Sequence, residues 1–148
     1  MNLPERITVI GAGTMGNGIA QVFAQFGNEV SLIDIKQEYL DRALGTIEKN
    51  LGRMVKKEKI TEADAAATLE RVVAVTDLKA AADSEMVVEA VFENFAVKKE
   101  IFTSLDGICG PEAILASNTS SISLTKIAGT TKRADKVIGM HFMNPVPM

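Results

Sequence analysis

Residues 7–16, "ITVIGAGTMG", carry the strongest fold signal in this chain. Residues 7–10 are a continuous apolar run, which predicts a strand buried on both faces of a sheet. Glycines follow at positions 11, 13 and 16, and a helical pattern begins at Thr14. A glycine-rich turn between a buried strand and a helix is the context that dinucleotide binding requires. The stretch therefore predicts a strand, a tight turn and a helix whose free N–H groups face a pyrophosphate.

Each glycine of this turn has a predicted role. Gly11 allows the tight turn, Gly13 lets the backbone approach a pyrophosphate, and Gly16 permits close packing of helix and strand. Gly18 adds room on the same helix. A tight turn without a ligand, or a site for another nucleotide such as S-adenosylmethionine, would give the same glycine pattern. The predicted cofactor-binding residues of the turn are Gly11, Ala12, Gly13, Thr14, Met15 and Gly16.

An acidic residue at the end of the second predicted strand, Asp34, narrows the choice of cofactor. It follows Gly16 by 18 positions, close to the spacing of about 20 expected for the acid that binds the adenosine ribose. Its carboxylate would accept hydrogen bonds from both ribose hydroxyls and would repel a 2′-phosphate. We therefore predict NAD rather than NADP. Lys36 is the counter-argument, because a nearby cation can host that phosphate.

Outside this stretch, apolar strand-like runs alternate with helical patterns along the chain. The alternation predicts an α/β fold, a Rossmann-type doubly wound and mainly parallel sheet with strand order 3-2-1-4-5-6. Amphipathic patterns at 37–59 and from Thr61, which forms a capping-box pattern with Asp64, predict a helical hairpin inserted after the second strand. Further helices are predicted at 14–25 and 95–105. The predicted strands are 7–10, 29–34, 72–75, 86–90, 113–116 and 136–140.

The bulk composition excludes several classes of function. The net charge is −3 at pH 7, so the chain lacks the basic footprint of a nucleic-acid-binding protein. No apolar run is long enough to cross a membrane. The single cysteine, Cys109, excludes an internal disulfide and favours a reducing cytoplasm. We expect Cys109 to be a small apolar residue at a helix end, and we predict no metal site.

Polar side chains follow three predicted strands at their carboxyl ends, in residues 89–94, 117–121 and 141–145. Ligands bind at that edge of an open α/β sheet. The third group holds the only histidine, His141, and an imidazole with a reference pKa of about 6.5 suits a general acid–base group. Together with the glycine turn, these groups predict a reaction site. A lone histidine with a structural hydrogen bond is the alternative for His141.

Four segments carry a resemblance to a known family: "VIGAGTMGNGIAQVFA" from Val9, "EAVFENFAVKKEIF" from Glu89, "ILASNTSSISLTKIA" from Ile114 and "GMHFMNPVPM" from Gly139. Residues 7–148 closely resemble the 3-hydroxyacyl-CoA dehydrogenases, especially the bacterial 3-hydroxybutyryl-CoA branch. The resemblance implies NAD-dependent oxidation of an (S)-3-hydroxyacyl-CoA to the 3-ketoacyl-CoA, or the reverse, in fatty-acid or butanoate metabolism. It points to 3-hydroxybutyryl-CoA as the substrate.

The family pattern implies a catalytic pair. His141 matches the catalytic histidine, and Ser120 matches a serine that binds the substrate oxygen close to the cofactor. Asn144 matches an asparagine near the nicotinamide and the substrate. In such a reaction hydride leaves C3 for the nicotinamide while a base removes the C3 hydroxyl proton. His141 would be that base and Ser120 would hold the oxygen beside it; N-capping of a helix, by Ser120 or by Ser121, is the alternative.

Four further positions match ligand contacts of the family. Glu93 and Lys98 match residues at the nicotinamide-ribose end of the cofactor, and an ion pair on a solvated helix start is the alternative. Asn50 and Lys57 fall where the helical hairpin of the family meets CoA. The family often has serine where this chain has Asn50, and a solvated lysine is the alternative for Lys57.

The family also implies parts that these 148 residues do not contain. After the histidine turn its members have a glutamate that orients the histidine, and then a helical domain that covers the acyl chain and forms a dimer. We therefore expect residues 1–148 to be an NAD-binding domain without that substrate and dimerisation domain. It should bind NAD(H), have weak or no turnover alone, and expose apolar surface at 136–140 and 142–148 that favours self-association.

Two rival functions stay open. A β-hydroxyacid dehydrogenase of the 6-phosphogluconate type also begins with a glycine-rich turn, but its base is a lysine in a later helix and "HFMNP" does not belong to it. A dinucleotide-binding module that has lost the chemistry would have the same fold. Turnover separates such a module from an enzyme, whereas nucleotide binding does not.

Overall fold

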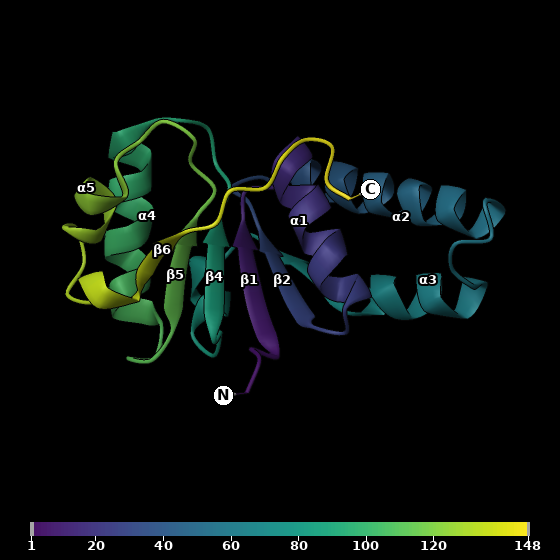
Figure 1. The fold of residues 1–148 in the computed structure, drawn as a ribbon, viewed down its shortest axis with the longest axis horizontal. Coiled ribbons are helices and arrows are strands. Elements are labelled where there is room, and N and C mark those ends of the chain that lie inside the picture. Colours follow the sequence, from purple (N-terminus) through teal and green to yellow (C-terminus); the bar gives the residue numbers. More distant parts are fainter. Residues whose placement is uncertain (1, 148) are drawn as a thin grey trace.

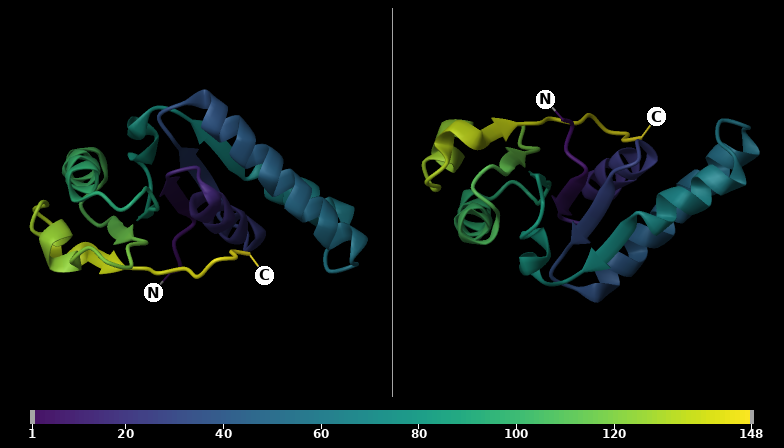
Figure 2. Two further views of the ribbon diagram at one scale, coloured as in Figure 1. Left: turned by 90° about the horizontal axis from the view of Figure 1, so that it is seen from above. Right: turned by 90° about the horizontal axis from the view of Figure 1, so that it is seen from below.

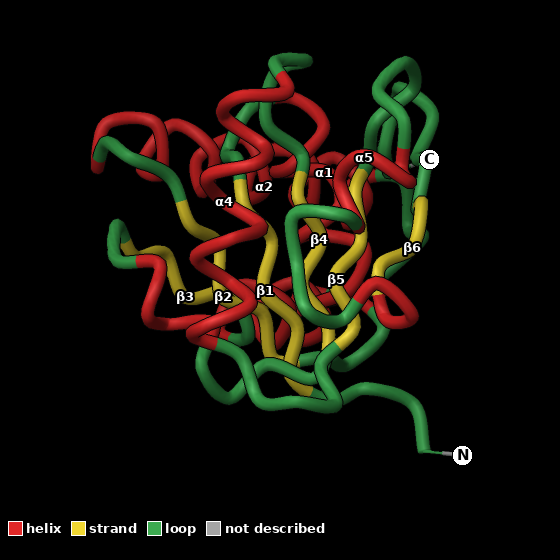
Figure 3. Tube along the Cα trace, turned by 90° about the vertical axis from the view of Figure 1, so that its left-hand side faces the viewer, coloured by secondary structure: helices red, strands yellow, loops and turns green. Residues whose placement is uncertain are grey.

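A parallel sheet forms the centre of the computed structural model, which describes residues 2–147. Its strands are β1 (Arg6–Ile10), β2 (Glu29–Ile33), β3 (Val72–Val75), β4 (Met86–Glu89), β5 (Ile114–Ser117) and β6 (Val137–Gly139). All six run in the same direction. Their order is β3-β2-β1-β4-β5-β6, as Figure 3 shows. The predicted doubly wound sheet and its strand order are confirmed.

Helices cover both faces of this sheet (Figures 1 and 2). On one face lie α1 (Thr14–Gln25), α2 (Gln37–Lys56) and α3 (Glu62–Glu70). On the other lie α4 (Phe95–Ile108), the short helix α5 (Leu124–Ala128) and the 3-10 turn η1 (Leu78–Ala81), while a second such turn, η2 (Ala134–Lys136), leads into β6. The helices α2 and α3 form the predicted hairpin, which extends beyond the edge of the sheet (Figure 1). Within residues 2–147, no helix is long and apolar enough to cross a membrane.

Two apolar cores, one on each face of the sheet, hold the layers together. Successive strand residues point to opposite faces, so Val88 of β4 packs in the core with α1 and α2, whereas Val87 packs in the core with α4. Ile47 and Leu51 belong to the buried face of α2, as its amphipathic pattern predicted. Because both faces are covered, the carboxyl ends of the strands form a rigid edge that presents the loops after β1, β4 and β5.

Helix α2 ends at Lys56, three residues before the predicted end at Lys59. Glu58 has a φ of 54°, in the left-handed region. The N–H of Glu58 donates to the carbonyl of Val55 at 2.9 Å, and the N–H of Lys59 donates to the carbonyl of Met54 at 2.9 Å. This is the Schellman arrangement, in which glycine usually takes the left-handed position. The predicted boundary was wrong because a glutamate stands where a glycine would have marked the end.

The other boundaries agree with the predictions or differ by one to three residues; the largest difference is that α4 ends at Ile108 rather than at residue 105. The capping box before α3 is confirmed. The N–H of Asp64 donates to Oγ1 of Thr61 at 3.0 Å, and the N–H of Thr61 donates to Oδ2 of Asp64 at 2.9 Å. Cys109 is buried directly after α4, as expected, and this burial raises the pKa of its thiol.

Candidate cofactor and catalytic site

A cleft of about 1360 Å³ opens at the carboxyl edge of the sheet. Its floor is formed at the ends of β1, β2 and β4 by Ile10, Ile33 and Ala90. Residues of α2 line it on one face of the sheet, residues of α4 line it on the other, and residues 144–147 add a further wall. Its volume exceeds the roughly 300–1,000 Å³ of ordinary small-molecule sites. The cleft therefore suits a large ligand at the edge where open α/β sheets bind nucleotides.

The glycine turn has the predicted geometry. Gly11 has a φ of 102°, and a Cβ there would come within 2.7 Å of the carbonyl oxygen of Ala90. At Gly16 a Cβ would overlap the carbonyl oxygen of Gly11, so this glycine permits the close packing of α1. At Gly13 a Cβ would meet no atom within 4 Å, which leaves the backbone open to the cleft. The turn residues that line the cleft are Gly11, Ala12, Gly13 and Thr14, whereas Met15 and Gly16 are not part of the lining.

Asp34 lies beside this turn. Its Oδ2 accepts from the N–H of Ala12 at 2.8 Å, and its Oδ1 accepts from the N–H of Ile35 at 2.6 Å. These bonds hold the carboxylate at the cleft, which Asp34 lines. The Lys36 ammonium lies over the ring of Tyr39, 5.5 Å from its centroid, and Lys36 is not among the residues that line the cleft. The arrangement favours a ribose with free hydroxyls over a 2′-phosphate.

The far end of the cleft is basic. Asn50 and Lys57, the two positions matched to CoA, both line it, together with Arg53 and Lys59. The side chains of Arg53, Lys57 and Lys59 are exposed. Asn144 lines the same cleft from the C-terminal segment. A basic, solvent-facing end suits the phosphate groups of a ligand.

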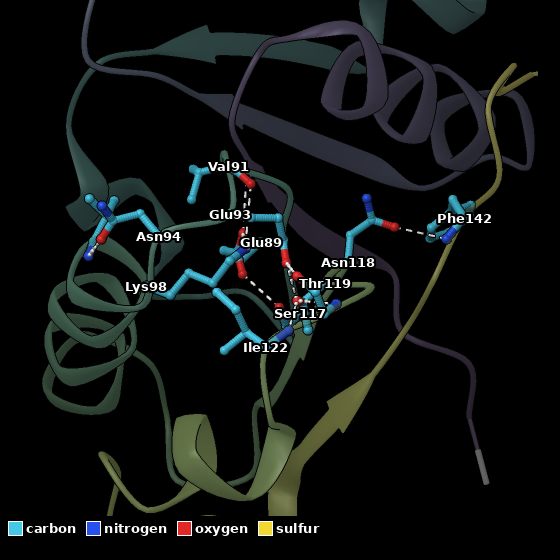
Figure 4. Close-up of polar contacts among 12 residues, drawn as sticks. Glu89, Val91, Glu93, Asn94, Lys98, Ser117, Asn118, Thr119, Ile122 and Phe142 are labelled. Atoms are coloured by element: carbon cyan, nitrogen blue, oxygen red, sulfur yellow. Dashed lines mark hydrogen bonds and ion pairs between the residues drawn. The ribbon is translucent and has the colours of Figure 1, made fainter.

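A buried ion pair lies under the polar edge, between β4 and α4 (Figure 4). Nζ of Lys98 is 2.6 Å from Oε2 of Glu89, and both side chains are fully buried. The hydroxyl of Ser117 donates to Oε1 of Glu89 at 2.7 Å, and the N–H of Val91 donates to Oε2 at 2.8 Å. Nζ also donates to the carbonyl of Val91 at 3.4 Å and lies 3.3 Å from Oε1 of Glu93. The alternative of a solvated pair is therefore wrong for Lys98, which lies behind Glu93.

Glu93 joins this ion pair to the loop after β5. Its Oε2 accepts from the hydroxyls of Thr119 and Ser121, each at 2.6 Å. Partial burial acts to raise the pKa of Glu93, but the hydrogen bonds from Ser121 and Thr119 and the positive charge of Lys98 outweigh it, so the pKa lies below its usual value. The ionised carboxylate thus holds the loop on both sides of Ser120. Neither Glu93 nor Lys98 lines the cleft.

The two predicted catalytic residues follow neighbouring strands. Ser120 lies in the loop after β5, His141 lies just beyond β6, and both are exposed outside the cleft lining. The N-cap of α5 is Ser123, whose hydroxyl accepts from the N–H of Lys126 at 3.4 Å. The alternative in which Ser120 or Ser121 caps this helix is therefore wrong. The Ser120 side chain stays available for a ligand.

The sequence analysis counted Glu89, Ser117 and Asn118 among the polar groups of this edge but gave none of them an individual role. A signal existed for Glu89, because a carboxylate inside an apolar strand run needs a buried partner. For Asn118 there was none. Its Oδ1 accepts from the N–H of Phe142 at 2.8 Å (Figure 4), across 24 residues of sequence, and no local pattern indicates such a contact.

The sheet, the glycine turn and the cleft define a dinucleotide-binding α/β domain. The chain belongs to the family described as 3-hydroxyacyl-CoA dehydrogenase, NAD binding domain, whose model matches residues 6–148. This match confirms the resemblance seen in the sequence, and with it the prediction of NAD as the cofactor.

Named relatives agree with that family. The probable 3-hydroxybutyryl-CoA dehydrogenase of Deinococcus radiodurans is 53% identical over 140 residues, which is 95% of this chain and 50% of that protein. The 3-hydroxybutyryl-CoA dehydrogenase of Clostridioides difficile is 46% identical over 143 residues, or 97% of this chain and 51% of that one. The crystal structure of (S)-3-hydroxybutyryl-CoA dehydrogenase from Ralstonia eutropha has a TM-score of 0.96 and 46% identity, covering 99% of this chain and 52% of that chain. The chain spans about half the length of the curated relatives it matches.

Proposed function

We propose that this chain is the cofactor-binding part of an NAD-dependent enzyme that oxidises (S)-3-hydroxyacyl-CoA, in particular 3-hydroxybutyryl-CoA, or reduces the 3-ketoacyl-CoA. One observation carries the proposal: a single cleft joins the glycine turn and Asp34 to a basic end at Asn50 and Lys57. Such a cleft has a place for NAD and a place for the phosphates of CoA. The names of the relatives support the acyl-CoA substrate class.

The residues at the turn fit NAD. The open space beside Gly13, where a Cβ would meet no atom within 4 Å, leaves room for a pyrophosphate at the N-terminus of α1. Asp34, held by the N–H of Ala12, would accept hydrogen bonds from the adenosine ribose. When bound, NAD supplies the hydride acceptor for the reaction. Asn144, which lines the cleft, would contact the nicotinamide side and the substrate.

The proton chemistry falls to His141 and Ser120. The imidazole of His141 would take the proton of the C3 hydroxyl, and it would return this proton in the reverse direction. The hydroxyl of Ser120 would donate to the same oxygen and hold it beside the imidazole. Glu93 supports this arrangement because it holds both neighbours of Ser120, and Lys98 supports Glu93 from below.

NADH binding, followed by fluorescence, tests the cofactor site. Asp34→Ala should weaken NADH binding about tenfold or more, because a hydrogen bond to a charged group contributes about 1.5–3 kcal/mol and tenfold corresponds to about 1.4 kcal/mol. Asp41→Ala is the matched control, since Asp41 is exposed on α2 and bonds to Gln37. Equal affinities of the wild type and Asp34→Ala would contradict the assigned ribose contact.

Consumption of NADH with acetoacetyl-CoA tests the chemistry, with His141→Gln as the control. Turnover that disappears in His141→Gln would show that this chain holds the catalytic group. NADH binding without turnover in the wild type would mean that the nucleotide site is intact and that the chemistry needs the parts of the family that these residues lack; turnover is the result that excludes a binding module. A wild-type chain that binds no NADH would overturn the proposal as a whole.

We also propose that the enzyme acts in the cytoplasm and that the longer enzyme is a homodimer. The free, buried thiol of Cys109 supports a reducing compartment. The homodimer of the longer enzyme rests on the family resemblance. For residues 1–148 alone, Ile138 and Met143, which are 38% and 79% exposed, support self-association through their apolar surface. Light scattering of the chain at high concentration tests it, and a monodisperse monomer would count against it.

A further inference from the structure

We infer that Asn118 is a positioning residue that holds His141 in register with Ser120. The inference rests on the proposed function, because it concerns the two residues assigned there to proton transfer. It also makes a claim about the structure alone: one side-chain amide ties residues 140–142, the histidine segment, to residues 118–122, the serine loop. Figure 4 shows this amide directed at Phe142 from the end of β5.

The main chain of Asn118 is itself fixed at the edge of the sheet. Its N–H donates to the carbonyl of Glu89 in β4 at 2.8 Å. On the other side of β5, the N–H of Met140 donates to the carbonyl of Ser117 at 2.9 Å. Within the described part of the chain this is the last main-chain bond that joins the histidine segment to β5, because β6 ends at Gly139. Beyond it, some other contact must hold His141.

The side chain of Asn118 supplies that contact. Its Oδ1 accepts from the N–H of Phe142 at 2.8 Å, in a partly buried position. A regular parallel ladder would offer a main-chain carbonyl at this point, and here the side-chain carbonyl takes its place. The residues on both sides of His141 are therefore tied to two consecutive residues of β5 and its loop, Ser117 and Asn118.

A second anchor, the ring of Phe142, acts in another direction. It meets the ring of Phe23 in α1 edge to face, with centroids 6.2 Å apart and an interplanar angle of 74°. That contact fixes the segment to the helix layer and not to the serine loop. Among the hydrogen bonds of residues 2–147, the bond from the Phe142 N–H to Asn118 is the one that ties the segment of His141 to the loop that carries Ser120.

The serine loop is held just as firmly on its other side. The hydroxyls of Thr119 and Ser121 both donate to Glu93, and Oγ1 of Thr119 also accepts from the N–H of Ile122 at 2.9 Å. Residues 118, 119 and 121 thus use their side chains as anchors, while Ser120 between them is exposed. Such anchoring keeps a reacting pair in a fixed geometry, on which proton transfer depends.

The test uses the fact that the chain has one histidine, so its ring signal in proton NMR needs no assignment. Asn118→Ala should shift and sharpen the His141 signal and speed exchange of the Phe142 amide hydrogen at least tenfold. Asn118→Asp keeps an acceptor oxygen and should restore slow exchange. The matched control is Asn28→Ala, because the Asn28 side chain also bonds the main chain 24 residues away: its Nδ2 donates to the carbonyl of Pro4, at the opposite edge of the sheet.

Two NMR results would overturn the inference: an unprotected Phe142 amide in the wild type, or a His141 signal that does not move in Asn118→Ala. Exchange of the Phe142 amide is measured on the wild type, so this test remains valid even if Asn118→Ala fails to fold. Where the chain turns over, Asn118→Ala should lower kcat about tenfold and leave NADH affinity within twofold, whereas equal losses in both would indicate a merely structural role. A wild type that binds no NADH but gives the expected NMR response would count against the proposed function and not against positioning by Asn118.

Discussion

At the level of single residues, the candidate site depends on one buried lysine. Lys98 is fully buried, and its ammonium is directed at Glu89, Glu93 and the carbonyl of Val91. A buried charge is tolerated only when its partners satisfy it. The family match placed this lysine at the cofactor. In the structure Lys98 lies outside the cleft lining, where it pairs with Glu93 and so supports the loop of Ser120.

Lys98→Met should therefore be strongly destabilising. It leaves the buried carboxylate of Glu89 without its cation, and breaking one partner of a buried pair costs about 3–5 kcal/mol. Urea unfolding measures the loss. Lys99→Met is the control, since Lys99 is exposed on the same helix and should change the free energy of unfolding by less than about 0.5 kcal/mol. Similar values for the two variants would contradict the pairing of a buried charge.

At the level of helices and strands, the end of α2 sets the shape of the basic end of the cleft. The left-handed Glu58 turns the chain so that Lys57 and Lys59 follow the helix into the cleft lining. A residue with a Cβ is strained in that region, by about 1–2 kcal/mol, whereas glycine is not. The strained residue, Glu58, lies in the turn between the end of α2 and the start of α3.

Glu58→Gly should accordingly stabilise the protein by about 0.5–1 kcal/mol, which is the relieved strain less the greater entropy loss of glycine. A change of glutamate to glycine in the helix interior should instead lower the stability. Glu48 is exposed within α2, and Glu48→Gly should destabilise by about 1 kcal/mol. Thermal unfolding of both variants measures the pair. Two losses of equal size would show that Glu58 is not strained in solution.

At the level of the entire molecule, the C-terminal segment, residues 140–147, lies across α1 (Figure 1) and lines one side of the cleft with residues 144–147. A Cβ at Gly18 would overlap the carbonyl oxygen of Val146, so this glycine, outside the nucleotide fingerprint, serves the packing of the segment. Asn144 and Val146 reach the cleft only because the segment lies there. The segment, the turn and α2 together complete one binding surface.

Gly18→Ala should displace this segment while α1 stays intact, because alanine favours a helix. Amide signals of Asn144 and Val146 should then report fast motion by NMR relaxation, and NADH affinity should fall. Gly45→Ala is the control. A Cβ at Gly45 in α2 would meet no atom within 4 Å, so this variant should gain up to about 1 kcal/mol in stability without moving the segment. An unchanged segment in Gly18→Ala would contradict this packing.

Sequence patterns were enough to predict the strand order, the glycine turn, the place of Asp34 at the end of β2 and the capping box at Thr61. Strand periodicity, glycine spacing and capping residues act over a few neighbouring positions, so these features can be recognised without the fold. The family resemblance then indicated the cofactor and the residues matched to catalysis.

Three-dimensional packing was needed to establish that Lys98 is buried, that Asn118 holds the segment of His141 and that Gly18 receives the C-terminal segment. Each of these contacts joins residues from different elements. Their partners are chosen by how the layers pack and not by the residues beside them in the chain. The sequence pattern records that a polar or small residue is present, and the packed sheet edge determines which group it meets.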